Sequence, residues 1–531
     1  MTTEAISLPR QPGTANRGEG TETNLTWRAS LNALQSVLDY SAKLAVNLLI
    51  IPILVSGLGR SLFGVWEMLS RLMGYLESAD GRPTQSLRLV ISNLQSERGP
   101  GTKRRWIGAA LRVWLWFLPL WMVTGAVVIW LAPAITKVSP PLHGPVRIAC
   151  AIMMAGVLLG GLATLPESVL RGMNLGYKRM GLQAGLSISA GALLAGAVYL
   201  GGGLIGIAAA QVLAVALAGI CFLILVRRQV PWFGFERPQP SEVRTLLHMS
   251  LWIAAGDAIA KMLLASDVLV LGMVLSPASV TTYVLTGYAA LLSTNLHSLA
   301  ADAVMPGLAG IIGEKDFARA AMLRRELIAL TIVFIAGVGS TILLWNQSFV
   351  HLWVGSENYA GIWTNLLLVL IAAQTALIRC DAYIIDAALK PGQRVRVSAV
   401  AAIIALALSS LLTYYAGLVG LCVGILCGRA VQSLWFPVLV RGCLERPSLR
   451  MSWVLRPFAA VAVLFASSAW LGQRVVVDNW LLWAGGVLLT MGLALGAMVG
   501  LGLPADAQVA VRNRLKELMR RAGLGRWSGG Q

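Results

Sequence analysis

The chain has 531 residues, of which 57% are hydrophobic and only 13% are charged, and its mean hydropathy is +0.72. Soluble domains carry less apolar sequence, so the composition argues against a soluble protein. The formal net charge of +19 does not indicate nucleic-acid binding, because basic residues collect in the cytoplasmic loops of membrane proteins.

The first 29 residues are polar and contain no apolar core, so we expect a disordered cytoplasmic tail and not a signal peptide. Fourteen apolar segments follow, each near the length of about 20 residues that one membrane crossing needs. They lie at about Leu31–Val55, Leu62–Ser78, Trp106–Ala132, Ile148–Val169, Leu182–Leu200, Leu204–Val226, Ser250–Leu275, Tyr283–Ile311, Leu327–Leu344, Trp363–Ala388, Val397–Tyr414, Leu418–Val440, Trp453–Leu471 and Trp480–Leu501. The sequence therefore predicts an all-α polytopic membrane protein with about 14 transmembrane helices.

The clearest of these segments is Met180–Val226, which runs for 47 residues without Asp, Glu, Lys, Arg or His. Gly201-Gly202-Gly203 interrupts it near its middle, so it predicts two helices joined by a tight turn. The six cysteines lie in or beside apolar segments, form no CxxC pair, and are interpreted as packing residues. They are Cys150, Cys221, Cys380, Cys422, Cys427 and Cys443.

The basic residues alternate between loops in a way that sets the orientation. With the N-terminus inside, the inner segments hold 33 of the 43 Lys and Arg residues, whereas the outer loops hold only four. A missed helix would invert every later loop and destroy this asymmetry. We therefore predict that both termini are cytoplasmic and that the protein spans its membrane many times.

Composition divides the chain into six parts. After the tail at 1–29 come an N-terminal six-helix bundle at 30–228, a Pro-containing cytoplasmic linker at 229–248 and a C-terminal six-helix bundle at 249–442. Helices 13 and 14 occupy 443–502, and a basic cytoplasmic tail occupies 503–531. That tail is either an amphipathic helix on anionic lipid or an ordinary solvated segment.

Two matches indicate that the bundles are repeats. The segment Asp39–Lys43 corresponds to Asp257–Lys261 at a separation of 218 positions, and Gly176–Arg179 corresponds to Pro391–Arg394 at 215. A spacing of six helices keeps both halves in the same orientation, so the pseudo-two-fold axis would lie along the membrane normal.

Several short segments resemble the polysaccharide transporter family (Wzx-type O-antigen flippases) of the multidrug/oligosaccharidyl-lipid/polysaccharide (MOP) exporter superfamily, over about 31–440. They are Pro52–Arg60, Phe63–Trp66, Asp267–Gly272, Ala301–Pro306 and Phe349–Gly355. The resemblance implies two six-helix bundles facing each other across a central cavity, with two helices appended. It also implies translocation of an undecaprenyl-pyrophosphate-linked oligosaccharide from the inner to the outer leaflet. The chain departs from the family pattern at Gly81–Pro83, where a more apolar Asp-Leu-Gly stretch is expected.

Ionisable residues inside spans are costly and therefore invite a functional reading. A pyrophosphate crossing the membrane needs cations, and the candidates for substrate binding in the cavity are Lys43, Lys261, Arg429, Arg71 and Arg379. The alternative is structural: Lys43 and Lys261 each follow an aspartate by four residues and could form neutralised pairs on one helix face. For Arg379 the alternative is a local pair with Asp381 or Asp386.

Coupling to a proton or sodium gradient would require a buried acid with a shifted pKa. The candidates are Asp39, Asp257, Asp267 and Asp302, while His297 is interpreted first as a packing residue. No P-loop, GxSxG or HExxH motif is present, so we expect no enzymatic activity, no catalytic residue, no metal site and no cofactor beyond an ion gradient.

The leading hypothesis is a flippase that uses alternating access in the synthesis of O-antigen lipopolysaccharide, capsule or exopolysaccharide. Its expected partners are the lipid-linked oligosaccharide, membrane lipids, and a polymerase or other polysaccharide-assembly proteins. A multidrug or lipid II-type exporter of the same fold is the first alternative. A membrane glycan polymerase or ligase is the second, and the short outer loops argue against it.

Overall fold

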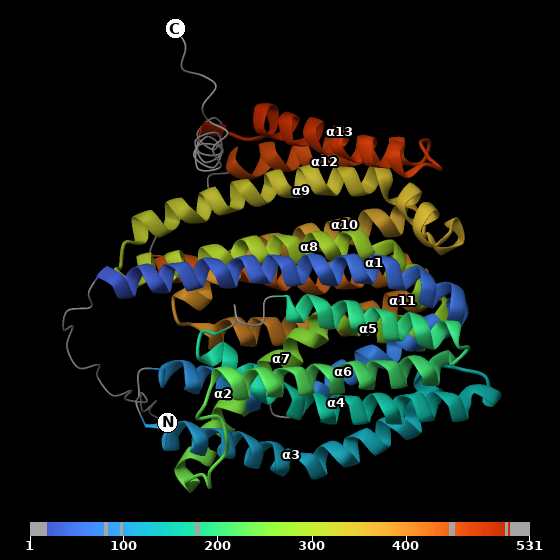
Figure 1. Cartoon of the computed structure of the whole chain (residues 1–531). Coiled ribbons are helices and arrows are strands. Elements are labelled where there is room, and N and C mark those ends of the chain that lie inside the picture. The colour runs from blue at the N-terminus through green and yellow to red at the C-terminus, as the bar shows by residue number, and fades with distance from the viewer. Residues whose placement is uncertain are drawn as a thin grey trace.

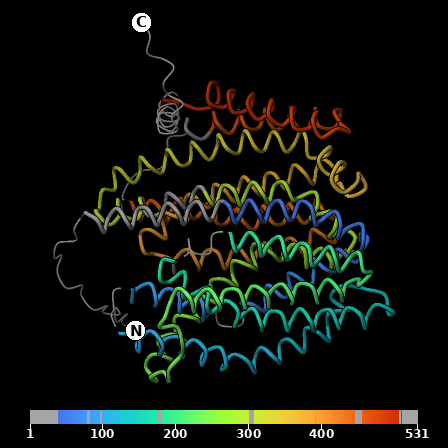
Figure 2. Tube along the Cα trace, in the orientation of Figure 1, coloured from blue at the N-terminus to red at the C-terminus, as the bar shows by residue number. Residues whose placement is uncertain are grey.

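A computed structural model describes residues 19–78, 83–95, 99–175, 181–444, 452–504 and 508–509, with the side chains of 19–37, 300–304, 306, 391 and 452–454 left out. Every element in this part of the chain is helical, and the helices run side by side (Figures 1 and 2). They are α1 (Glu19–Ser78), α2 (Pro83–Asn93), α3 (Pro100–Ile135), η1 (Pro140–Leu142), α4 (His143–Gly172), α5 (Leu182–Tyr199), α6 (Gly203–Gln229), α7 (Pro240–Val274), α8 (Pro277–Gly313), α9 (Phe317–Val354), η3 (Ser356–Asn358), α10 (Ile362–Ala387), α11 (Pro391–Leu444), α12 (Ser452–Gly472), α13 (Trp480–Ala497) and η4 (Met498–Gly502).

Two of the helices are hairpins that each supply two membrane spans. In α1 the backbone leaves the helical region at Gly59 (φ 74°), and in α11 it does so at Ala416 and Gly417 (φ 57° at the glycine). A positive φ is readily adopted by glycine, which has no Cβ to clash. Ten helices in the described part are long and apolar enough to cross a membrane. Counting both arms of α1 and α11, and including α7 and α8, gives the fourteen spans expected, and the all-α polytopic fold is confirmed.

The structure supports the repeat, because turns in the two halves are separated by the same numbers of positions as the sequence matches. Gly59, where α1 bends, and Pro277, where α8 begins after α7, are separated by 218 positions. Gly202, in the turn between α5 and α6, and Gly417, where α11 bends, are separated by 215. These are the two separations found in the sequence, so these two turns of the first half have counterparts in the second.

The halves meet along α1. Its second arm runs antiparallel to α7: Gly64 lies against Pro277 at one end, and the side chain of Met68 fills the space beside Gly272. The first arm packs on α8 and α9, where the Trp353 indole donates a 2.7 Å hydrogen bond to the Leu48 carbonyl. Helices α12 and α13 lie along α9 at the edge of the second half, away from α1 (Figure 1).

Two boundaries differ from expectation. Helix α7 begins at Pro240, inside the expected linker, and Glu242 accepts a 2.7 Å hydrogen bond from the Gln239 backbone N–H at its start. Proline suits a first helical turn because that N–H has no helical partner. Helix α1 begins at Glu19, inside the expected disordered tail, since extending a formed helix costs little. Most of the basic tail expected at 503–531 lies outside the described residues.

Candidate functional site

Polar contacts join the halves at both ends of the molecule. At one end Arg60 donates a 2.8 Å hydrogen bond to Thr282. The other end we call the basic end, because its loops carry most of the Lys and Arg residues. Here Lys261 of α7 lies 3.2 Å from Asp257 and 3.7 Å from Glu77 of α1. Its ammonium also donates to the Gly74 carbonyl, and Ser78 donates a 2.5 Å hydrogen bond to Asp257. We call Gly74, Glu77, Ser78, Asp257 and Lys261 the polar latch.

The contacts continue one turn deeper. The Tyr75 hydroxyl donates to the Lys261 carbonyl at 3.1 Å and lies 2.6 Å from the Ser266 hydroxyl. The predicted residues Asp257 and Lys261 therefore face the other half and not lipid. The Asp–Lys spacing of four residues forms the expected ion pair, but the ammonium is shared with the first half.

The equivalent residues of the first half are placed differently. Asp39 is buried, with 8% of its surface exposed, while Lys43 is exposed. Lys43 shares a helical face with Val46 and Ile50, both of which lie against Gly191 of α5. The ammonium of Lys43 is thus carried on the side of α1 that faces α5, whereas that of Lys261 closes the contact between the halves.

A second group of charges lies near the middle of the α1–α7 contact. Glu67 of α1 is within electrostatic range of both Arg71 and Asp267. Asp267 accepts a 2.8 Å hydrogen bond from the Tyr283 hydroxyl of α8. The Nε atom of Arg71 is buried and has no hydrogen-bond partner within the described part of the chain. The side chain of Asp302 lies outside the described residues.

The second half contains a cavity of about 320 Å³ between α7, α10 and α11. Arg429 lines it and is buried, and its guanidinium donates to Thr375 Oγ1 at 2.5 Å and to the Leu263 carbonyl at 2.8 Å. Arg379 also lines it and donates to Ser298 of α8. Two of the predicted cationic residues are therefore brought together on one cavity wall.

Arg379 is not part of the local pair that was considered. Asp381 instead accepts two hydrogen bonds from Arg324 of α9, at 2.8 and 3.0 Å, and Asp386 lies 2.7 Å from Arg394. For Asp381 the reason is geometric, because residues two apart on a helix do not face each other. The sequence contained no local signal for the pair between Arg324 and Asp381.

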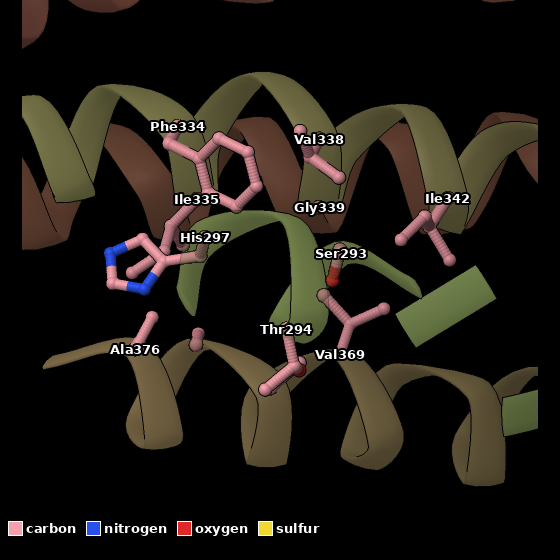
Figure 3. A pocket seen from close by; sticks show the side chains of 12 residues that line it. Ser293, Thr294, His297, Phe334, Ile335, Val338, Gly339, Ile342, Val369 and Ala376 are labelled. Carbon is pink, nitrogen blue, oxygen red and sulfur yellow. The ribbon is translucent and has the colours of Figure 1, made fainter. Parts of the chain in front are cut away.

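His297 of α8 lies in a small apolar pocket of about 20 Å³. Figure 3 shows its ring between Phe334 of α9 and Ala376 of α10, and its Nε2 atom is 3.0 Å from the Thr331 hydroxyl. The pocket is too small for a substrate, so the histidine contributes to packing, as interpreted from the sequence.

Sequence reasoning missed the largest described cavity. It measures about 960 Å³ and lies mainly in the first half, between α1, α2, α4, α5 and α6, with Ile253 of α7 also lining it. Its polar lining consists mainly of amides and hydroxyls. Only ionisable residues inside spans were considered as candidates from the sequence, so these groups were not found. A further cavity of about 510 Å³ lies at the end opposite the basic end, between the bend of α1 and η3.

The comparisons with known proteins agree with this architecture. Residues 114–312 match the family described as "Polysaccharide biosynthesis protein". No curated protein sequence matches the chain significantly. Among solved structures, the chain is similar to "Lipid II flippase MurJ, inward closed conformation", with a TM-score of 0.66, 11% identity, and coverage of 88% of this chain and 98% of that one.

Two multidrug transporters have the same fold. An inward-facing MATE family transporter of the MOP superfamily superposes with a TM-score of 0.59 at 13% identity, covering 78% of this chain and 99% of that one. An outward-facing MATE structure gives a TM-score of 0.53 at 15% identity, covering 81% and 98%. At these identities the likeness concerns the fold alone.

Two repeated helical halves that meet through a polar latch, with a cavity in each half, define a multi-pass membrane protein with the fold of these solved flippase and multidrug-transporter structures. The expected resemblance to a polysaccharide transporter family agrees with the family match over residues 114–312, and the solved structures share the fold.

Proposed function

We propose that the protein is a flippase that moves an undecaprenyl-pyrophosphate-linked oligosaccharide from the cytoplasmic to the periplasmic leaflet of the bacterial inner membrane. In this proposal both termini are cytoplasmic. The product would serve the synthesis of O-antigen, capsule or exopolysaccharide, beside a polymerase and other assembly proteins.

The physical demand on such a protein is to carry a charged sugar head past the membrane interior. An unpaired charge is costly there, so the path must offer cations and hydroxyl or amide groups. The polyprenyl chain can remain in lipid throughout, because it is as apolar as the bilayer.

The observation that supports the proposal most is the position of Lys261. A lysine near the basic end of a span is turned toward the other half, where it shares its ammonium between Asp257, Glu77 and a carbonyl. Separation of the halves at the basic end would release this ammonium toward an entering pyrophosphate. Lys43, Arg71, Arg379 and Arg429 are the further cations proposed to serve the same path.

Energy for the cycle would come from a proton or sodium gradient. The acids proposed for coupling are Asp39, Asp257, Asp267 and Asp302. Asp257 combines this role with the polar latch, because protonation would weaken its pairing with Lys261 and its acceptance of the Ser78 hydrogen bond.

The test is reconstitution into proteoliposomes with a fluorescent undecaprenyl-pyrophosphate oligosaccharide, with transfer followed by an impermeant quencher. We expect parental protein to transfer it and Lys43→Ala/Lys261→Ala to be slower by on the order of tenfold or more, since a hydrogen bond to a charged group contributes about 1.5–3 kcal/mol. Arg147→Ala, which removes an exposed cation near the opposite end, is the control. Transfer at the parental rate by the double variant would overturn the cationic path.

The shared fold with a lipid II flippase and with multidrug transporters keeps a second candidate function open, export of lipid II or of drugs. The same vesicles loaded with lipid II, or with a cationic dye, separate the possibilities. Transfer of lipid II alone, or of the dye alone, would replace the proposed substrate.

A further inference from the structure

The large cavity in the first half extends through much of the membrane depth. It follows α4 from Gly156 to Arg171, a length of about 22 Å at 1.5 Å per residue. The hydrocarbon core of a bilayer is about 30 Å thick. The cavity therefore reaches from the basic end past the membrane midplane, and at about 960 Å³ it has room for several sugar rings.

The walls of the cavity combine apolar residues with polar groups, and most of these polar groups are uncharged. Its lining includes amides and hydroxyls from five helices, namely Ser70, Thr84, Gln85, Thr164, Gln183 and Gln211. Gln85, Thr164 and Gln211 are exposed to the space. Amides and hydroxyls both donate and accept hydrogen bonds, as sugar hydroxyls require.

The basic end of the cavity carries two arginines close together. Burial and the neighbouring Arg171 guanidinium lower the pKa of Arg88 on α2, yet an arginine stays protonated in proteins. Glu167 lies 2.8 Å from Arg171 and neutralises part of this charge. Guanidinium groups bind phosphate oxygens through pairs of hydrogen bonds, so the mouth has the chemistry of a phosphate site.

We propose that this cavity is the binding site for the head of the transported molecule, entered from the basic end. The pyrophosphate would lie at Arg88 and Arg171, and the oligosaccharide would extend along Gln183 and Gln211. This assignment rests on the proposed function and moves the substrate from the contact between the halves into the first half.

The cavity is connected to the polar latch through one side chain. Glu77 lines the cavity and also lies 3.7 Å from Lys261 of the second half. A ligand that draws Glu77 into hydrogen bonds with its sugars would remove one partner of Lys261. Binding in the first half would thereby loosen the contact that closes the basic end.

Two double variants separate the two parts of the site. Arg88→Gln/Arg171→Gln removes the anion site, and Gln183→Leu/Gln211→Leu removes the amides, while Arg227→Gln/Arg228→Gln, at the exposed end of α6, is the matched control. The ligands for calorimetry in detergent are inorganic pyrophosphate, a free oligosaccharide, and a water-soluble short-chain prenyl pyrophosphate oligosaccharide.

We expect the arginine variant to lose at least tenfold in affinity for pyrophosphate and for the conjugate. The glutamine variant should lose as much for the free oligosaccharide and the conjugate but bind pyrophosphate like the parent. Equal binding and equal transfer by parent and both variants would overturn the site while leaving the flippase proposal intact. Failure of the parent to transfer any lipid-linked oligosaccharide would instead overturn the function, and the pyrophosphate measurement would still decide the anion site.

A variant that fills the cavity tests whether the oligosaccharide binds there if one of the double variants does not fold. A Cβ added at Gly160 would meet only Val215, at 3.8 Å, so Gly160→Phe can extend into the cavity. It should abolish oligosaccharide binding with every polar group retained. Unchanged oligosaccharide binding by Gly160→Phe would place the sugars elsewhere.

Discussion

Ser78 of α1 donates a 2.5 Å hydrogen bond to Asp257 of α7, and the two residues belong to different halves of the molecule. Asp257 at the same time lies 3.2 Å from Lys261. One carboxylate therefore holds both a hydrogen bond across the contact and the ammonium that completes it. If the proposed alternation between two open states occurs, these contacts must break in each cycle. Together they must hold the halves closed, while each single contact must be weak enough to break.

Lys261→Met should open the basic end. The variant keeps a long side chain but leaves Asp257 and Glu77 without the shared cation, and the like charges of the two acids then repel each other. We expect faster amide hydrogen exchange in the peptides containing 70–78 and 253–263, measured by mass spectrometry in detergent or nanodiscs.

Lys261→Arg serves as the control for that change, since it retains a cation that can reach both carboxylates. Its exchange should stay close to that of the parent. Protection of both peptides in Lys261→Met at the parental level would show that the polar latch does not hold the halves together.

Gly64→Ala should separate the halves at the opposite end. A Cβ at position 64 would lie 1.8 Å from the backbone oxygen of Pro277, and a backbone atom cannot move aside as a flexible side chain can. We expect increased hydrogen exchange around 60–66 and 277–284, together with a shift toward a state that is open at that end.

The same arm of α1 supplies the control. A Cβ at Gly74 would meet nothing within 4 Å, and Gly74→Ala keeps the carbonyl that Lys261 uses. The helix gains the same intrinsic preference in both variants. If Gly64→Ala and Gly74→Ala exchange alike, close approach at Gly64 does not control the opposite end.

The fold could be predicted from the sequence because each membrane helix is a long, uninterrupted run of apolar residues. The charge-free stretch with three glycines became α5, a turn and α6, as expected. The separations of 218 and 215 positions recur in the hairpin turns, because the repeat preserves helix lengths where it does not preserve side chains. The distribution of Lys and Arg among the loops also predicts which side of the membrane each loop faces, and this orientation remains a prediction.

The contacts of the site were harder to predict from the sequence, because they join residues that are distant in it. Arg324 binds Asp381 across 57 positions, and nothing local to either residue indicates the other. The cavity of the first half was missed for a different reason: amides such as Gln211 are tolerated in apolar segments and attract no notice until five helices bring them together.

Asp381→Asn should strongly destabilise the second half. Both members of its pair with Arg324 are almost completely buried, and removing one charge of a buried pair costs about 3–5 kcal/mol because the other remains unpaired. The midpoint of thermal unfolding in detergent should fall clearly. Asp386→Asn is the control, since Asp386 and Arg394 are partly exposed and such pairs contribute only about 0–1 kcal/mol. Equal midpoints for the two variants would contradict the difference in burial.

Arg429→Lys should separate a structural role of this arginine from a substrate-binding one. The guanidinium donates in two directions, to Thr375 and to the Leu263 carbonyl, and a lysine, with its single ammonium group, cannot reproduce this planar fork. Because both bonds hold helices of the second half together, we expect a loss of about 1.5–3 kcal/mol in stability, seen as a lower unfolding midpoint. Transfer per folded molecule should change little, because lysine keeps the positive charge that the proposed path requires. Arg379→Lys, in the same cavity, is the comparison. A fall in transfer without a change in the midpoint would contradict the structural role and would mean that the path needs the guanidinium itself and not only a positive charge.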